Sequence, residues 1–258
     1  MIKPKTALIT GASSGIGLEF AKIFASKGVN LIITARNKVA LEELATDISN
    51  SYKISVNIII ADLAEEDGAE KLFVAVEKLG IKIDFLINNA GFGNFGNFST
   101  NLLLKEKELL NVNINSLTTL TKLFIPHLTE TKGNILNVAS IVAYFPGPNF
   151  ATYHASKAYV LSFSLGLRAD LRKNGINVTV LCPGSTATKF FTNSKINVDI
   201  GSMSARSVAQ AGYYGLLKKK AIVVPGITNK LFATIINIIP KELALLLIGI
   251  FYSSIKLI

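Results

Sequence analysis

The 258-residue sequence is poor in the side chains that disulfides and metal centres require. It has one cysteine, Cys182, and only two histidines. A single cysteine excludes an intrachain disulfide and a cysteine-based metal cluster, so we expect no bound metal. Charged residues are also scarce, at 17% against 50% hydrophobic residues, and this balance excludes an intrinsically disordered chain.

The N-terminal region also lacks a long apolar run. The first run, at residues 7–9, is too short for the hydrophobic region of a signal peptide and leads directly into a glycine-rich turn. We therefore expect a cytoplasmic protein, either free in that compartment or peripheral on a membrane.

Positive charge is in excess, with 27 lysines and arginines against 17 acidic residues. The basic residues are scattered, the longest run is residues 218–220, and no aromatic stripe interleaves them. This pattern is typical of a solvated surface, and we expect no nucleic-acid partner. It is also compatible with a substrate on an acidic carrier, such as an acyl carrier or coenzyme A.

Seven short apolar segments alternate with helical segments along the chain. The expected strands span residues 5–10, 29–34, 54–61, 83–87, 133–138, 176–181 and 221–224. The expected helices begin near Ile16 and span residues 38–50, 64–79, 102–128, 151–173 and 204–220. This alternation predicts an α/β protein with a doubly wound, seven-stranded parallel sheet of the Rossmann type. We expect one domain, with a catalytic part at residues 1–225 and a hydrophobic helical extension at 226–258.

A glycine-rich turn lies between the first strand and the first helix. Glycines permit a tight turn and close approach of the backbone to phosphate, and the helix N-terminus favours an anion. Strand, glycine turn and helix is the setting of a dinucleotide-binding loop, although the spacing here is G-x-x-x-G-x-G. The residues expected to bind the cofactor are Gly11, Ser13, Ser14, Gly15, Ile16 and Gly17.

The ends of the second and third strands are expected to bind the adenosine part of the cofactor. An acidic residue after the second strand would bind the ribose hydroxyl of NAD, but this chain has Arg36 there. A guanidinium suits a 2′-phosphate, so we predict NADP(H). Asp62, followed by Leu63, can accept a hydrogen bond from adenine, can cap the next helix, or can do both.

Two further turns follow central strands and are expected to hold the nicotinamide end. The first contains Asn89, Ala90 and Gly91; the second contains Pro183, Gly184, Thr186 and Thr188. Three segments are expected to surround the substrate. They are the aromatic loops at residues 92–98 and 144–150 and a lid at residues 189–203.

Tyr153 and Lys157 are four residues apart and therefore share one face of a helix. A nearby ammonium favours the phenolate and lowers the pKa of the phenol. A tyrosine tuned in this way can exchange a proton with a carbonyl or an alcohol. Taken alone, the pair also fits an ordinary amphipathic helix, and Asn113, amid apolar neighbours, fits a structural role.

Together and in this order, the motifs resemble the short-chain dehydrogenase/reductase family. The resemblance covers residues 5 to about 225 and includes the glycine turn, Asn88–Gly91, Asn113, Ser140 and Tyr153-x-x-x-Lys157. It implies that Tyr153 is the general acid or base and that Lys157 lowers its pKa and binds the nicotinamide ribose. It also implies that Ser140 holds the substrate oxygen, and that Asn113 anchors a water in a proton relay.

The resemblance implies a reversible, NADPH-dependent reduction of an apolar carbonyl, either a ketone or a 3-oxoacyl compound. It also implies a homodimer or homotetramer. Two alternatives remain: an NADP(H)-sensing regulatory protein with weak catalysis, and a membrane scaffold built on the tail. The intact tyrosine–lysine pair favours the enzyme.

The last 33 residues depart from simple members of that family. They contain two apolar segments, at residues 231–239 and 243–252, separated by Pro240, Lys241 and Glu242. Neither segment has the ~20 apolar residues of a membrane-spanning helix. Either the tail packs on its own domain or across a dimer, or residues 228–258 dip into a bilayer surface with Lys230 at the headgroups. Similar tails in steroid- and acyl-reductase relatives imply an apolar substrate.

Overall fold

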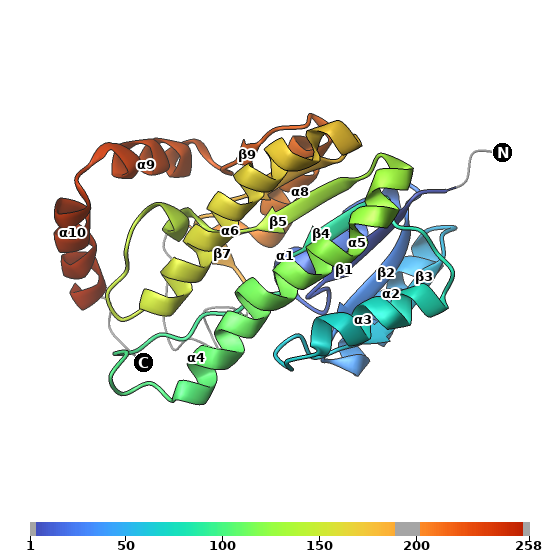
Figure 1. Cartoon of the computed structure of the whole chain (residues 1–258), viewed down its shortest axis with the longest axis horizontal. Helices are drawn as coiled ribbons and strands as arrows, with labels where there is room; N and C mark the ends of the chain where they lie inside the picture. Colours follow the sequence, from blue (N-terminus) through green and yellow to red (C-terminus); the bar gives the residue numbers. More distant parts are fainter. Residues whose placement is uncertain (1–3, 189–201, 255–258) are drawn as a thin grey trace.

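The computed structural model describes residues 4–188 and 202–254. Its centre is a seven-stranded parallel sheet in the order β3-β2-β1-β4-β5-β6-β9 (Figure 1), which confirms the predicted fold class. The strands are β1 (Thr6–Thr10), β2 (Asn30–Ala35), β3 (Val56–Ile60), β4 (Phe85–Asn88), β5 (Asn134–Val138), β6 (Asn177–Leu181) and β9 (Ile222–Val223). Since all pairs are parallel, the carboxyl ends of the strands meet at one edge, where ligands bind in such sheets.

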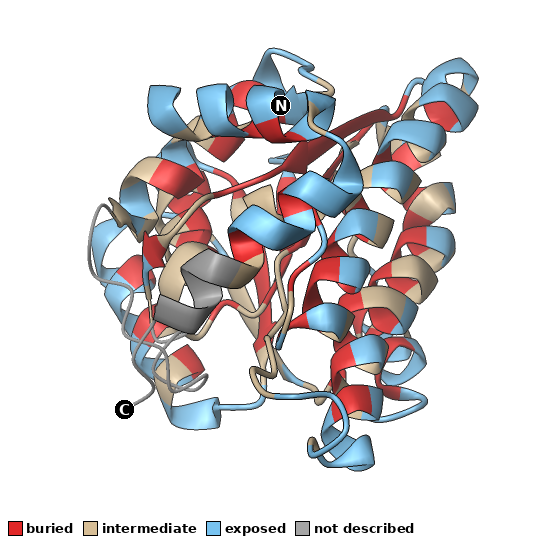
Figure 2. Cartoon of the chain, turned by 90° about the vertical axis from the view of Figure 1, so that its left-hand side faces the viewer, coloured by how far each residue is buried: buried red, intermediate tan, exposed pale blue. Residues whose placement is uncertain are grey.

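Helices cover both faces of the sheet. On one face, core clusters join it to α1 (Gly15–Ser26), α2 (Lys38–Ser51) and α8 (Ala205–Leu217). On the other face lie α3 (Gly68–Lys78), α5 (Leu117–Thr131) and α6 (Ala151–Asp170). Figure 2 shows buried residues along the strands and the inner faces of these helices, with exposed residues on their outer faces.

The helix predicted over residues 102–128 is divided into three parts. It consists of α4 (Leu103–Leu110), a π-helical segment η1 (Asn111–Ser116), and α5, which continues to Thr131. Single π-helical turns often mark functional sites. Asn113 lies in this segment, so the position singled out from the sequence coincides with the irregular turn.

The helix predicted from residue 64 begins four residues later, at Gly68. The backbone amide of Ala64 donates to Asp62 Oδ1 at 2.9 Å, and that of Glu65 donates to the Asp62 carbonyl. These bonds close a turn before α3. Asp62 therefore does not cap α3, whose N-cap position is Asp67.

A second, two-stranded sheet joins β7 (Thr186–Ala187) to β8 (Met203–Ser204). The sequence did not predict it. The lid expected at residues 189–203 falls largely on residues 189–201, which lie outside the described part of the chain.

The C-terminal extension forms two helices, α9 (Ile227–Ile238) and α10 (Lys241–Ser254). Their inner faces pack on Phe145 of the loop before α6 through Ile236, Ala244 and Ile248. Across the described residues, none of the helices combines the length and the apolar character that crossing a bilayer requires. The inner faces of the extension thus pack on the rest of the domain.

Candidate active site

The glycine turn is held in place by Asn89. Its side-chain nitrogen donates to the carbonyl oxygens of Thr10 at 2.9 Å and Gly11 at 3.2 Å. The backbone amides of Asn89 and Ala90 each donate to Thr10 Oγ1 at 3.0 Å. Gly11 has a φ of +66°, which favours glycine. Asn89 and Ala90 therefore connect the end of β4 to the turn, a role that the sequence did not reveal.

The start of α1 fits a phosphate group. Gly15 has a φ of +56°, and a Cβ there would lie 3.1 Å from Thr188 Cγ2, so the loop after β6 meets the glycine turn. A Cβ on Gly17 would collide with the Gly11 carbonyl. Ser14 makes no side-chain capping bond, and the first turn of α1 carries no acidic residue. Such an N-terminus attracts an anion.

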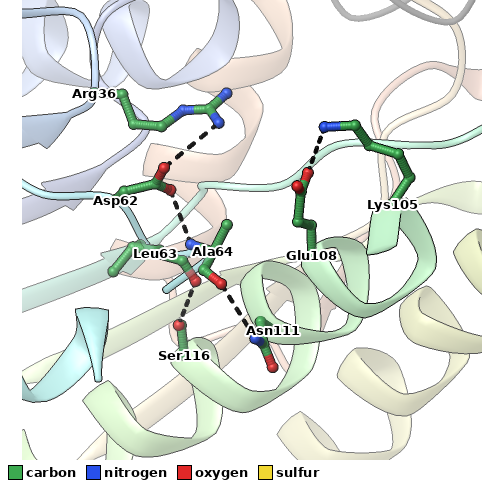
Figure 3. A network of polar contacts seen from close by, with 8 residues as sticks. All are labelled: Arg36, Asp62, Leu63, Ala64, Lys105, Glu108, Asn111 and Ser116. Atoms are coloured by element: carbon green, nitrogen blue, oxygen red, sulfur yellow. Dashed lines mark hydrogen bonds and ion pairs between the residues drawn. The ribbon is translucent and has the colours of Figure 1, made fainter. Parts of the chain in front are cut away.

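Arg36 and Asp62 face each other at the ends of β2 and β3 (Figure 3). Arg36 Nη1 lies 3.8 Å from Asp62 Oδ2, and the arginine side chain is 69% exposed. An exposed guanidinium at this distance is held loosely. It is therefore available to an anionic group that approaches the end of β2 from solvent.

The π-helical segment is tied to the same strand end. Ser116 Oγ donates to the Leu63 carbonyl at 2.8 Å, and Asn111 Nδ2 donates to the Ala64 carbonyl at 3.1 Å (Figure 3). The Leu63 side chain is buried in the core. Only its backbone can therefore contribute to the adenosine end of the site.

Tyr153 and Lys157 lie on α6 behind the ends of β4 and β5. Lys157 Nζ is 5.8 Å from the centre of the Tyr153 ring and donates to the Val138 carbonyl at 3.0 Å. Burial lowers the pKa of Lys157 to about 8. Burial also raises the pKa of Cys182 to about 12, so its thiol is uncharged at neutral pH.

Asn113 reaches the same place from η1. Its Oδ1 accepts from the amide of Phe92 at 3.2 Å, and its Nδ2 donates to the Phe92 carbonyl and to Ser156 Oγ at 2.9 Å. A Cβ on Gly91 would lie 3.0 Å from Asn113 Oδ1 and 3.2 Å from Lys157 Nζ. Asn113 and Lys157 thus flank Gly91, and Ser156 is a partner that sequence reasoning missed.

Ser140 begins a short 3₁₀ segment, η2 (Ile141–Tyr144), after β5. Its Oγ accepts from the Val142 amide at 3.3 Å and donates to the Pro183 carbonyl at 3.4 Å. Val142 in turn packs near Tyr153. Ser140 is therefore positioned between the loop after β6 and the tyrosine.

The loop after β6 contacts the C-terminal extension. Thr186 Oγ1 donates to the Gly184 carbonyl at 3.0 Å. A Cβ on Gly184 would strike the Asn229 amide of α9, and Asn229 Nδ2 donates to the Pro225 carbonyl at 2.9 Å. Asn229 is a second neighbour of the site that the sequence did not indicate.

One wall beside Tyr153 is apolar. Leu109, Phe150 and Tyr153 form a cluster against which Phe92 and Phe95 pack. Phe98, expected in the same wall, is 65% exposed and lies outside this cluster. Only part of the loop at residues 92–98 therefore contributes to the predicted substrate wall.

Glu106 of α4 organises that loop. It is buried, and its Oε1 accepts from Asn94 Nδ2 at 2.7 Å and from Asn101 Nδ2 at 2.8 Å. A second link joins the two aromatic loops, since the Gly96 amide donates to the Asn149 carbonyl at 2.8 Å. These bonds hold the wall against Tyr153.

His154, next to the tyrosine, packs its ring against Phe145 and against Phe150 of this wall. Its Nδ1 lies 2.9 Å from the Phe145 carbonyl, and a Cβ on Gly147 would strike its ring. Burial lowers the pKa of His154 to about 4, so the imidazole is neutral at neutral pH. Because a carbonyl only accepts, Nδ1 carries the proton and anchors the loop before α6.

Comparisons with known proteins point to one family. A family model described as short chain dehydrogenase matches residues 5–199. Very-long-chain 3-oxoacyl-CoA reductase of Anas platyrhynchos is 33% identical over 216 residues, covering 81% of this chain and 69% of that protein. Serine 3-dehydrogenase of Agrobacterium fabrum is 35% identical over 186 residues, covering 72% and 73%. A solved short-chain dehydrogenase from Sphingobium yanoikuyae in complex with NADPH has 29% identity and a TM-score of 0.82, covering 92% and 97%.

Proposed function

The chain belongs to the short-chain dehydrogenase family, and from this premise we propose that it reduces an apolar carbonyl compound to an alcohol with NADPH, reversibly. The observation that carries the proposal is the junction at Gly91, where Asn113 Oδ1 and the Lys157 ammonium approach the same backbone position. Tyr153 lies one helical turn before Lys157. A sensing protein would need the glycine turn but not this junction.

The proton transfer is proposed to depend on two residues of α6, Tyr153 and Lys157. Tyr153 is proposed to give its phenolic proton to the carbonyl oxygen during reduction and to take it back during oxidation. The ammonium of Lys157, 5.8 Å from the ring centre, stabilises the phenolate left behind. Ser140 is proposed to donate to the same substrate oxygen. Its present bond to the Pro183 carbonyl is long, at 3.4 Å, so it is exchanged at little cost.

The dinucleotide supplies the hydride, and the chain positions it. The N-terminus of α1 and the glycine turn suit its pyrophosphate. The proposal of NADP(H) rests on Arg36, which is exposed at the end of β2 where a 2′-phosphate would lie. The similar structure from Sphingobium yanoikuyae, solved in complex with NADPH, supports it.

The substrate is proposed to be apolar because Phe92, Phe95 and Phe150 line the wall beside Tyr153. A ketone and a 3-oxoacyl thioester both fit this description, and the similarity to a very-long-chain 3-oxoacyl-CoA reductase supports the second. The similarity to serine 3-dehydrogenase suggests a polar substrate instead. A serine would leave its charged groups against aromatic rings, which disfavours it.

The experiment is a substrate panel with the purified chain, following the absorbance of NADPH. Aliphatic ketones, oxosteroids and 3-oxoacyl thioesters are tested for reduction, L-serine is tested with NADP⁺ for oxidation, and each assay is repeated with NADH or NAD⁺. We expect turnover of long-chain apolar carbonyls and a higher kcat/KM with NADPH than with NADH. Serine oxidation exceeding all carbonyl reduction would contradict the proposed substrate class. NADPH binding without turnover of any compound would support the sensing alternative.

A further inference from the structure

Helix α9 presents an apolar stripe to solvent. Its buried positions are Ala233 and Ile236, which face the protein. On the opposite side Ile227, Leu231, Ile235 and Ile238 follow helical spacing and are all exposed, Ile227 at 84% and Ile238 at 78%. A surface helix normally turns such a stripe inward, so the reversed orientation indicates a partner.

Helix α10 continues this surface. Ala244 and Ile248 are buried, whereas Leu243, Leu246 and Leu247 are exposed. Both helices lie at one end of the molecule, beyond α6 and β9 (Figure 1). The four residues of α9 and these three leucines are called the C-terminal apolar surface below.

The inner side of the same helices holds the loop before α6. Phe145 packs against Ile236, Ala244 and Ile248. The centre of its ring lies 5.5 Å from the centre of the Phe232 ring. Lys241 Nζ donates to the Tyr144 carbonyl at 3.0 Å. Whatever covers the C-terminal apolar surface is therefore separated by α9 and α10 from the loop that borders the substrate wall.

Charge distinguishes the candidate partners. A row of polar side chains, Lys230, Thr234 and Asn237, runs along α9 beside the apolar stripe. An apolar face bordered by a lysine is typical of a helix that lies in a membrane interface. The chain carries a net charge of +10, which opposes self-association and favours an anionic surface.

We infer that the C-terminal apolar surface docks on an anionic bilayer, with its leucines and isoleucines among the acyl chains and Lys230 at the headgroups. A cavity of about 520 Å³ between the polar row, Tyr144 and β9 gives a headgroup room beside Lys230. Docking places α9 and α10 between the bilayer and the loop before α6. If the proposed function holds, an apolar carbonyl in the membrane is then separated from the loop that borders the substrate wall by these two helices alone.

The test is co-sedimentation with vesicles of equimolar phosphatidylcholine and phosphatidylglycerol. The variant Leu231→Gln with Leu246→Gln changes two exposed leucines, so the fold is retained. We expect its partition coefficient to fall roughly tenfold or more. The matched control, Leu79→Gln with Leu217→Gln, changes two exposed leucines, one just after α3 and one at the end of α8, and is expected to bind like the wild type.

The contribution of charge to vesicle binding is measured separately. Lys230→Gln is expected to lower binding about fivefold, and Lys53→Gln, another exposed lysine, to leave it unchanged. Pure phosphatidylcholine vesicles are expected to bind more weakly than the mixed ones.

Binding that is equal for the wild type and the Leu231/Leu246 variant overturns the inference. So does a light-scattering result in which the wild type is dimeric, this variant is monomeric and neither pellets with vesicles, because the surface is then an interface between copies. Tyr153→Phe is expected to pellet like the wild type. Vesicle binding therefore succeeds or fails independently of the proposed function.

Discussion

Lys157 Nζ donates a 3.0 Å hydrogen bond to the carbonyl oxygen of Val138, the last residue of β5. This bond holds the ammonium at the carboxyl edge of the sheet, one helical turn beyond Tyr153. The carbonyl compensates only part of the cost of burial, and the pKa of Lys157 falls to about 8. The group beside Tyr153 therefore changes charge not far above neutral pH.

That shift makes stability depend on pH. Between pH 8 and 10.5 the unfolded chain binds more protons at this lysine than the folded chain does, so the free energy of unfolding rises with pH across that window. Relative to Lys157→Met, the cofactor-free wild type should gain up to about 3 kcal/mol over this range and nothing below it. Urea unfolding at several pH values measures this. Lys53→Met, which changes an exposed lysine, is the control, and a constant difference between wild type and Lys157→Met would contradict the account.

Arg36 should decide the choice of dinucleotide. Arg36→Ala removes an exposed guanidinium and is expected to raise the Kd of NADPH by tenfold or more while changing that of NADH less than about twofold. Lys38→Ala removes another exposed cation two residues away and should change neither. Titration of dinucleotide fluorescence measures both constants. An equal loss for the two cofactors would show that Arg36 does not meet the 2′-phosphate.

Glu106 should act on substrate binding through the aromatic loop. Glu106→Ala leaves the amides of Asn94 and Asn101 without their acceptor, so we expect KM to rise several-fold and the free energy of unfolding to fall by about 1–3 kcal/mol. Glu106→Gln keeps an acceptor oxygen, so its KM should lie close to the wild-type value. Glu108→Ala, on the same helix, removes an ion pair with Lys105 and should leave KM unchanged. If Gln behaves like Ala, the loop is not held by these bonds.

The sheet was predictable because each of its strands is a short apolar run between turns. β1, for example, is buried along its whole length, and its composition allows little else. The candidate site residues could be selected as a set, since Asn113, Ser140, Tyr153 and Lys157 follow one another in a family pattern. The sequence placed them in order along the chain, and only the structure shows which side chains touch.

The residues that contact and position the candidate site residues were not predictable from the sequence. Glu106 lies between Lys105 and Lys107 and looks like part of a charged surface helix. It is buried because the loop immediately before α4 folds back and brings two asparagine amides to it. Ser156 and Asn229 are ordinary helical residues whose contacts depend on tertiary packing. The start of α3 was misplaced because Asp62 closes a turn on Ala64, a local bond that competes with helix formation.

Tyr153 is proposed to be the proton donor, and the Tyr153→Phe variant is the decisive test. Turnover of the best carbonyl in the panel and the Kd of NADPH are measured for the wild type and for this variant. The control is Tyr159→Phe, which changes a tyrosine of the same helix whose hydroxyl pairs with Thr118. We expect Tyr153→Phe to lose about 10²–10⁴-fold in kcat while the Kd of NADPH stays within about twofold of the wild-type value. We expect Tyr159→Phe to keep both values near those of the wild type. A Tyr153→Phe enzyme that keeps kcat within a few-fold of the wild type would contradict this proposal.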